Sequence, residues 1–598
     1  MTDKSYALEQ GDSERPVTGR PVIYGKKGVI SSGHYLTSMA GMQILLQGGN
    51  AFDALAASIF AAAVIEPTAS YSLGAECTYT LFDSASGDLL ALSGQGPSPF
   101  GATIDYYRSK QLDSIPTGPG LDAPIAFTVP GVVGATFSML EKYGTRKVED
   151  VLMSAIEYAL DGVPNYEYML NRIKSEETLQ QFQLFPPGGI EIFYDQGQVP
   201  EAGTLLIQTA LGNTLNKMVS AAKFSGTDRL TEIAAARQCF YKGEIADAII
   251  AGVRSVGGLM DENDLSEYQE EYSTPASVDY RGYSIHSQST WTQGPVCLQA
   301  LNILENFDLG SLGYNSAKYI HIVTETLKLV FADREAFYGD PNFASIPIDG
   351  LLSKEYAAQR AKRINLETAC PGLPSFGDPW SYSKLEGYVS KQPGFVDDIE
   401  ADLQYEAGTT HISVVDQFGN FACATPSGGA FNKSVFFPQL GFALSTRSEM
   451  FNLVPGHPNC LEPGKRPRTT IINFMVSEND VPIMTVGCPG GDAQAQANLQ
   501  LLLNTILWGM NVQEAVEAPR FSTLSVPNSF YPHTYLQGQL ALEHEVPEAT
   551  ANELARMGHK IVRVATCGMG GTVTRKNVGS SVLETSADPR RSCYALSW

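Results

Sequence analysis

Apolar positions recur at helical spacing over long parts of the chain, and β-rich runs lie between them. Residues Tyr35 to Leu46 carry apolar side chains every three or four positions and are followed by Gly48-Gly49-Asn50, so a helix that stops there is predicted. A second, alanine-rich helix follows from about Phe52. Cys77 to Phe82 and Leu89 to Leu92 alternate as strands do. The chain thus begins with a helix pair followed by two strands.

The same reading continues along the chain. Further helices are predicted at Gly131–Tyr143, Val148–Leu160, Leu206–Ala222, Thr231–Val253, Cys297–Asn306 and Lys318–Phe337, and a strand at Tyr280–His286. Because helix and strand patterns alternate throughout, we expect an α/β fold.

One junction interrupts this pattern. Residues 370–408 are rich in Pro, Gly, Ser and Asp and have little periodicity, which predicts an exposed, mobile segment. The segment ends at Gly408-Thr409-Thr410-His411, and the β-rich runs HISVV and FACAT follow, separated by Asp416–Asn420, as in a hairpin. A loose segment that runs directly into a strand is what a chain cut at the first residue of that strand would need.

Composition narrows the functional classes. The chain has 598 residues, with 41 Lys+Arg against 64 Asp+Glu, a net charge of −23 and a pI near 4.8. This charge argues against nucleic acid and against anionic membranes as partners. At 43% hydrophobic residues the chain is not disordered, and its length suggests roughly three to four domains at about 150 residues each.

Targeting and metal signals are weak. The nine cysteines are scattered without a CxxC pair, and neither a metal cluster nor a phosphate-binding loop is evident, so no metal and no cofactor is expected. The first 16 residues lack the apolar stretch of a signal peptide. The apolar run Ala54–Ile65 is shorter than the about 20 residues that span a bilayer. We therefore expect a cytoplasmic protein without a membrane partner.

The junction at Thr409 suggests a specific chemistry. A threonine hydroxyl is a weak nucleophile, but at the start of a chain its own α-amino group can take the proton. That amine has a pKa of about 7.7–8.0, close to working pH. Gly408 permits unusual backbone geometry at the peptide bond that would be cleaved. The alternative is that Thr409 and Thr410 are ordinary residues at the start of a strand.

A resemblance to a known family favours the first interpretation. The segment AGTTHISVVDQFGNFACATPS (407–427) resembles the signature that opens the small subunit of γ-glutamyltranspeptidases, which are self-processing N-terminal-nucleophile hydrolases. Other segments resemble the family in the same order: ILLQGGNAFDALAAS (44–58), TVPGVVGATFSMLEKYGT (128–145), DYRGYSIHS (279–287), LNILENFDLGSLGYNSA (301–317), KRPRTT (465–470), VGCPGGD (486–492), EAPRFS (517–522) and SADPRR (586–591). The resemblance extends over nearly the whole chain, from about residue 28 to 591.

The resemblance implies roles for individual residues. Thr409 would be the nucleophile, freed by cleavage after Gly408, and Ser427 would support it where the family has a second threonine. Gly490 and Gly491 would donate backbone N–H groups to the oxyanion, although a plain turn is the alternative for this motif. The hydroxyl pair near the substrate would be Thr469 and Thr470.

The resemblance also implies the architecture. We expect a four-layer αββα sandwich, α/β (α+β) in class, forming one interleaved structural domain. Residues 1–408 would become the large subunit and 409–598 the small one, joined as a heterodimer, with a higher oligomer left open.

Two residues near these motifs invite other interpretations. His411 lies two positions from the nucleophile and shares its strand face, yet a structural role is favoured because the family does not use it as a base. Glu76 lies in an apolar strand, and a solvated edge position is the alternative to a functional role.

The sequence departs from the family where the γ-glutamyl group is held. Gln95 falls where an arginine grips the α-carboxylate of the substrate, and Met450 falls where an acidic residue holds its α-amino group. Arg447 stands where the family has a neutral amide. The expected substrate is therefore a small-molecule amide whose acyl group is not γ-glutamyl but carries a carboxylate, with Gln95 and Arg447 at the binding positions. A true γ-glutamyl transpeptidase or glutathione hydrolase and an unprocessed, inactive binding homologue remain the alternatives.

Overall fold

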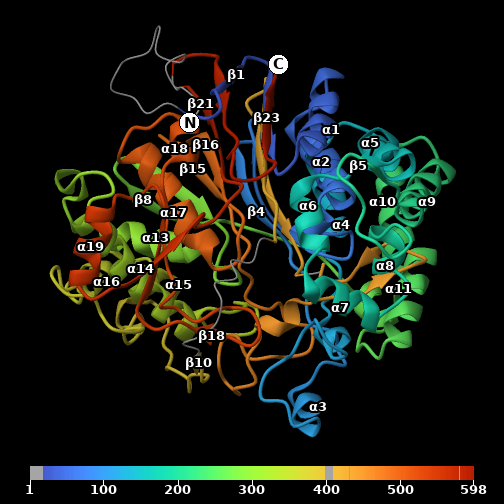
Figure 1. Ribbon diagram of the computed structural model, residues 1–598. Coiled ribbons are helices and arrows are strands. Elements are labelled where there is room, and N and C mark those ends of the chain that lie inside the picture. The colour runs from blue at the N-terminus through green and yellow to red at the C-terminus, as the bar shows by residue number, and fades with distance from the viewer. Residues whose placement is uncertain (1–17, 398–407, 430, 578) are drawn as a thin grey trace.

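The computed structural model describes residues 18–397, 408–429, 431–577 and 579–598. Two seven-stranded sheets stack face to face at its centre, and helices cover the outer face of each (Figure 1). The fold is the expected four-layer αββα sandwich of the N-terminal-nucleophile hydrolase type.

The first sheet, called the β11 sheet, is antiparallel throughout. Its strands in spatial order are β23 (Tyr594–Ser597), β2 (Gly28–Ser32), β11 (Ile412–Asp416), β12 (Phe421–Ser427), β3 (Glu76–Asp83), β4 (Asp88–Gly94) and β7 (Glu271–Ser273). The hairpin β11–β12, which follows Thr409 in the chain, is thus inserted between β2 and β3, which precede it.

The second sheet, called the β16 sheet, also mixes strands from both sides of Thr409. Its spatial order is β1 (Ile23–Gly25), β22 (Leu583–Thr585), β21 (Thr572–Lys576), β16 (Val481–Gly487), β15 (Phe474–Glu478), β9 (Tyr283–Ser287) and β8 (Ala276–Tyr280). The single strand predicted at 280–286 is instead a hairpin, in which Tyr280 pairs with Tyr283. Its two turn residues, Arg281 and Gly282, have φ of +52° and +87°, which suits a two-residue turn.

Helices on the outer face of the β11 sheet come mostly from the first half of the chain (Figure 1, right). They are α1 (Tyr35–Leu46), α2 (Ala51–Ile65), α4 (Val132–Tyr143), α5 (Val148–Asp161), α9 (Thr209–Ser225), α10 (Arg229–Tyr241) and α11 (Glu244–Ser255). The prediction of a single helix at 231–253 was wrong, because the helix is interrupted at Lys242-Gly243 and forms α10 and α11. Helix α2 is buried on all sides, which explains its alanine-rich composition.

Helices on the outer face of the β16 sheet pack into a second core (Figure 1, left). They are α13 (Gly294–Leu304), α14 (Ala317–Phe337), α16 (Lys354–Ala361), α17 (Ala493–Ile506), α18 (Val512–Glu517) and α19 (Glu548–Arg556). Between the two sheets lies a small apolar cluster of Val29, Val415, Phe421, Met475 and Leu583. No helix within the described ranges is long and apolar enough to cross a bilayer.

Shorter elements connect these layers. They are the helices α3 (Ile104–Ser109), α6 (Glu167–Ile173), α7 (Glu176–Leu184), α8 (Gly189–Phe193), α12 (Glu262–Ser266) and α15 (Ile348–Leu351), the strands β5 (Val163–Pro164), β6 (Leu205–Leu206), β10 (Val396–Asp397), β13 (Phe436–Phe437), β14 (Phe442–Ala443), β17 (Phe521–Thr523), β18 (Thr534–Tyr535), β19 (Gln539–Glu543) and β20 (Lys560–Val564), and the 3₁₀ helices η2 (Pro67–Ala69), η3 (Ala123–Ala126), η4 (Leu309–Leu312), η5 (Trp380–Tyr382) and η6 (Arg447–Met450). Of the predicted mobile segment 370–408, residues 398–407 lie outside the described residues.

Candidate active site

Thr409 lies three residues before β11 and is joined to Gly408 in this structure. Its φ is +80°, an outlier for a β-branched residue. Both of its backbone polar groups are held, since the N–H donates to the Ala69 carbonyl and the carbonyl accepts from Arg591 Nη1 at 2.5 Å. Such strain persists only where the surroundings impose it, and it is common at functional sites. The backbone on the N-terminal side of Thr409 is therefore held in a conformation that it would not adopt alone.

The Thr409 hydroxyl faces the hydroxyl of Ser427. Antiparallel pairing sets Ser427, the last residue of β12, opposite Glu76 of β3, and the Thr410 N–H donates to the Pro426 carbonyl. This register places Ser427 Oγ 2.9 Å from Thr409 Oγ1, and both side chains are buried. The structure thus brings together the two residues that were predicted as nucleophile and support.

A buried ion pair lies directly behind Ser427. Arg447, at the start of η6, donates from Nη2 to Ser427 Oγ at 2.6 Å and from Nε to Glu76 Oε1. Glu76 is fully buried, so the solvated edge position considered for it was wrong. Burial raises the pKa of Glu76, and the Arg447 guanidinium opposes that rise. The third guanidinium nitrogen, Nη1, is buried and has no hydrogen-bond partner among the described residues.

A second buried pair holds the other side of Thr409. Arg591, which donates to the Thr409 carbonyl, has its Nη2 3.5 Å from Glu66 Oε2. Glu66 Oε1 accepts from the Thr37 hydroxyl at 2.8 Å. Burial raises the pKa of Glu66, while Arg591 lowers it. The sequence marked Arg591 only as part of a motif and did not indicate Glu66, because nothing local shows that the two residues meet.

The two glycines predicted for the oxyanion lie in the turn between β16 and α17. Gly490 and Gly491 have φ of +126° and +53°. They line a cavity of about 430 Å³, together with Lys433 and Phe530. The φ of Gly490 is in a region that side chains rarely adopt, which explains the glycine.

Gln293, which sequence reasoning missed, joins two of the predicted groups. Its side-chain nitrogen donates to the Thr470 carbonyl at 2.9 Å and to the Gly491 carbonyl at 3.0 Å, and its oxygen accepts from Arg334 Nη1 at 3.0 Å. Thr469 is held by its N–H, which donates to the Trp291 carbonyl at 2.9 Å. The Thr470 hydroxyl is buried and unpartnered among the described residues, as a group that meets a ligand would be.

Two contacts connect the glycine turn to the nucleophile. The Arg447 guanidinium lies 5.2 Å from the ring centre of Phe530, which lines the same cavity as Gly490. On the other side, His411 packs so closely on Gly487, the last residue of β16, that a Cβ there would overlap its ring. The sites predicted around residues 409 and 490 therefore lie at neighbouring ends of the two facing sheets.

His411 itself is fully engaged in packing. Its Nδ1 lies 2.9 Å from the Thr425 hydroxyl and its Nε2 2.9 Å from the Ser413 hydroxyl. Burial lowers its pKa to about 3, so the ring is neutral at working pH. With both nitrogens in use, it does not serve the Thr409 hydroxyl.

Gln95 stands apart from this group. Its side chain is buried just after β4, donates to the Gly96 carbonyl at 3.2 Å, and leaves its oxygen unpartnered among the described residues. Its hydrogen bonds to described residues, with Ser93 and Gly96, do not reach Thr409, Ser427 or Arg447. The structure thus brings Arg447 to the nucleophile but does not join Gln95 to it.

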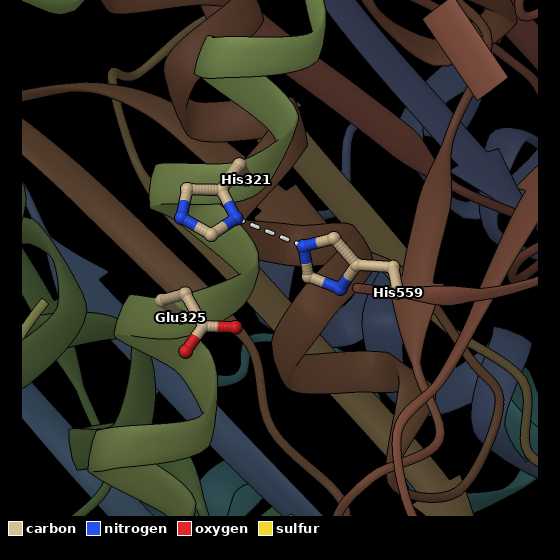
Figure 2. A group of neighbouring side chains, drawn as sticks. All are labelled: His321, Glu325 and His559. Atoms are coloured by element: carbon tan, nitrogen blue, oxygen red, sulfur yellow. Dashed lines mark hydrogen bonds between the residues drawn. The ribbon is translucent and has the colours of Figure 1, made fainter. Parts of the chain in front are cut away.

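Apart from the candidate active site, one cluster within the described residues combines three side chains that could ligate a metal ion. His321 and Glu325 lie one turn apart on α14, and His559 faces them from the segment before β20 (Figure 2). The two rings are joined at 2.9 Å, and His321 Nε2 bonds the Asn365 carbonyl at 2.7 Å. The Lys328 ammonium lies 2.5 Å from the Glu325 carboxylate and already supplies its counter-charge. We therefore interpret this group as packing between α14 and the C-terminal segment.

Comparison with known proteins supports the family resemblance. The family model for gamma-glutamyltranspeptidase matches residues 37–598. The chain is 31% identical over 543 residues to a glutathione hydrolase proenzyme of Bacillus subtilis (strain 168), covering 90% of this chain and 86% of that protein. It is 32% identical over 548 residues to the acylase ACY 1 proenzyme of Pseudomonas sp. (strain SE83), covering 90% and 88%.

Solved structures agree as well. The crystal structure of cephalosporin acylase from Bacillus halodurans aligns with a TM-score of 0.81 at 28% identity, covering 99% of both chains. Both sequence relatives are named as proenzymes. The chain belongs to the gamma-glutamyltranspeptidase family and is an amide hydrolase or acyl transferase of that family.

Proposed function

We propose that this protein cleaves itself before Thr409 and then hydrolyses an amide through an acyl-enzyme on the Thr409 hydroxyl, with an acyl group that carries a carboxylate but no α-amino group. The observation that carries the proposal is the surroundings of Thr409: strained backbone, a hydroxyl 2.9 Å from Ser427, and a cation, Arg447, one hydrogen bond further on.

Self-cleavage would use the same hydroxyl as turnover. Thr409 Oγ1 attacks the Gly408 carbonyl carbon, the C–N bond breaks, and the acyl group passes from nitrogen to oxygen as an ester. Water then hydrolyses this ester, which leaves a Gly408 carboxylate and a free Thr409 amine. The positive φ at Thr409 favours this step because cleavage releases the strain.

Turnover repeats the attack on a substrate. The free amine takes the hydroxyl proton as Oγ1 attacks the amide carbonyl, and the amine product then leaves with a proton. Backbone N–H groups of Gly490 and Gly491 would stabilise the developing oxyanion. Water resolves the resulting ester and regenerates Thr409.

Two features support the acyl preference. Arg447 Nη1 has no hydrogen-bond partner in the part of the chain that the structure describes, and a guanidinium nitrogen pairs well with a carboxylate. The position predicted to bind an α-amino group holds the thioether of Met450, and the neighbouring carboxylate of Glu449 already faces Lys433 at 3.6 Å. An ammonium on the substrate would therefore be desolvated, and the nearby carboxylates Glu449 and Glu76 are already paired with the cations Lys433 and Arg447.

Three matched anilides test the proposal. The γ-glutamyl, glutaryl and butyryl anilides differ by one group at a time, since the glutaryl compound lacks only the α-amino group and the butyryl compound also lacks the carboxylate. We expect glutaryl anilide to have the highest kcat/KM, about 10- to 100-fold above butyryl anilide, from one charge-assisted hydrogen bond.

Gel electrophoresis under denaturing conditions comes first and should show fragments of 408 and 190 residues. Faster turnover of γ-glutamyl anilide than of glutaryl anilide would contradict the acyl preference and point to a glutathione hydrolase. A single uncut chain without activity would contradict the proposal and support the alternative of an inactive binding protein.

A further inference from the structure

The Arg447–Glu76 pair biases the direction of the hydrogen bond that reaches the nucleophile. A guanidinium has donors only, so Ser427 Oγ must accept from Arg447 Nη2. Among the described residues, the other side-chain oxygen bonded to Ser427 Oγ is Thr409 Oγ1, at 2.9 Å, and either hydroxyl can donate in this pair. The charged donor on Ser427 makes the Ser427 hydroxyl more acidic and so favours donation from Ser427 to Thr409 Oγ1.

We propose that Arg447 is a positioning residue that acts through Ser427, and that Glu76 sets the pKa of the Thr409 amine by balancing the charge of Arg447. This inference rests on the proposed function, because it concerns the same nucleophile. The Thr409 proton, which is not needed for the bond to Ser427, is free to point at the amine two carbons away. When the ester later breaks, the Ser427 proton and the cation behind it stabilise the alkoxide that departs from the acyl carbon.

A charged residue next to a catalytic base changes the pKa of that base. A cation near an amine disfavours the protonated form and lowers its pKa, whereas an adjacent carboxylate cancels that effect. Among the described residues, the other charges around Thr409 come as balanced pairs or are neutral: Glu66 with Arg591, Lys433 with Glu449, and the neutral His411. The Gly408 carboxylate that cleavage creates is present in the wild type and in every variant, so it does not change the comparison. Removing the charge of Glu76 alone thus leaves one uncompensated cation beside the site.

The experiment separates charge from hydrogen bonding. Glu76→Gln keeps the shape of the side chain but removes its charge, and Arg447 remains charged because guanidinium groups stay protonated. We expect the acidic limb of the kcat/KM profile, which reports the free amine, to move about one pH unit toward acid. The double variant Glu76→Gln/Arg447→Gln has no charge in either position, so its limb should return to that of the wild type. Measured with butyryl anilide, which has no carboxylate for Arg447 to bind, its rate should stay about tenfold low, since Ser427 has lost a charged donor.

A matched control is available. Asp333 is another buried carboxylate paired with an arginine, Arg360, and its partners lie on α13, α16 and the segment after α16. Asp333→Asn should lower stability without moving the pH limb. The uncharged double variant also keeps the test open if Glu76→Gln folds poorly, because a neutral pair is better tolerated than one buried charge.

The outcomes are distinct. A wild-type chain that stays in one band overturns the proposed function, and this inference with it, before any pH profile is measured. If the wild type is cut and active, a Glu76→Gln limb within 0.2 units of the wild type, or full recovery of the rate in the double variant, would overturn this inference alone. Movement of the limb in Asp333→Asn would likewise show that the shift is not specific to Glu76.

Discussion

Gln293 allows a sharp test of how the glycine turn is held. Its replacement by leucine removes two neutral hydrogen bonds, to the Thr470 and Gly491 carbonyls, and one bond from the charged Arg334. At about 1 kcal/mol for each neutral bond and about 2 kcal/mol for the charged one, the free energy of unfolding should fall by about 4 kcal/mol. Arg334 keeps Asp492 and Glu335 as partners, so its charge stays balanced.

The same change should reduce catalysis in the protein that remains folded. The turn would lose the bond that fixes the Gly491 carbonyl toward Thr470, and misdirected oxyanion donors cost rate. We expect kcat to fall by at least tenfold. The loss should be smaller than the 10²–10³-fold loss that follows removal of an entire oxyanion donor. Urea unfolding gives the stability, and kcat is measured with the best of the three anilides at a temperature where the variant is folded.

Gln299 supplies the matched control. It is a buried glutamine in α13 that bonds Asp333 and the Tyr338 hydroxyl. Gln299→Leu should cost about 3 kcal/mol of stability and leave kcat unchanged. If Gln293→Leu loses stability but keeps the wild-type kcat, the reasoning that connects Gln293 to the oxyanion site is refuted.

Three further predictions concern the nucleophile, the turn and the core histidine. Thr409→Ala should remain a single chain on a denaturing gel and lack activity, whereas Thr409→Ser should be cut more slowly; cleavage of the alanine variant would place the nucleophile elsewhere. Gly490→Ala leaves space for the added methyl group, since the nearest atom is 3.8 Å away, but an alanine is strained at a φ of +126°. We therefore expect kcat to fall about 10²-fold while the KM for the substrate changes little. An unchanged kcat would show that the turn does not take part in the mechanism. His411 has a folded pKa of about 3 against about 6.5 when unfolded, so its stabilisation is complete above pH 6.5 and is lost as the pH falls toward 3, at up to about 1.4 kcal/mol per pH unit. Urea titrations of wild type and His411→Gln should therefore converge on acidification, and parallel curves would contradict this assignment.

Local patterns predicted the elements well where one sequence feature decides them. Helix α1 ends at Leu46, just before Gly48-Gly49, as predicted. The errors fall where a short break decides the structure, as at Lys242-Gly243, where two helices replace the predicted one. A periodicity that spans such a break looks continuous, because both helices bury apolar faces.

Only the site residues that belong to sequence motifs could be predicted. Thr409 and Ser427 lie 18 residues apart on one hairpin, so a motif contains both and the structure brings them together. Glu76 and Arg447 are 371 residues apart, and they meet because β3 pairs with β12 and because Gly74 and Leu444, which precede them in the chain, form a bridge. Arg447 was predicted as a cation for the substrate, but nothing in the sequence could show that a buried carboxylate already pairs with it.

The arrangement of the chain ends has a consequence for engineering. The Trp598 carbonyl accepts from the N–H groups of Lys26, Lys27 and Gly28, at 2.8 to 3.2 Å, so β23 ends beside the start of β2. A short flexible linker could therefore join residue 598 to the beginning of β1 and open the chain before Thr409, since closely spaced ends favour circular permutation. Such a protein would begin at Thr409 once its initiator Met is removed. It would have the free Thr409 amine without any self-cleavage. Its activity would therefore report on substrate turnover independently of the self-cleavage step.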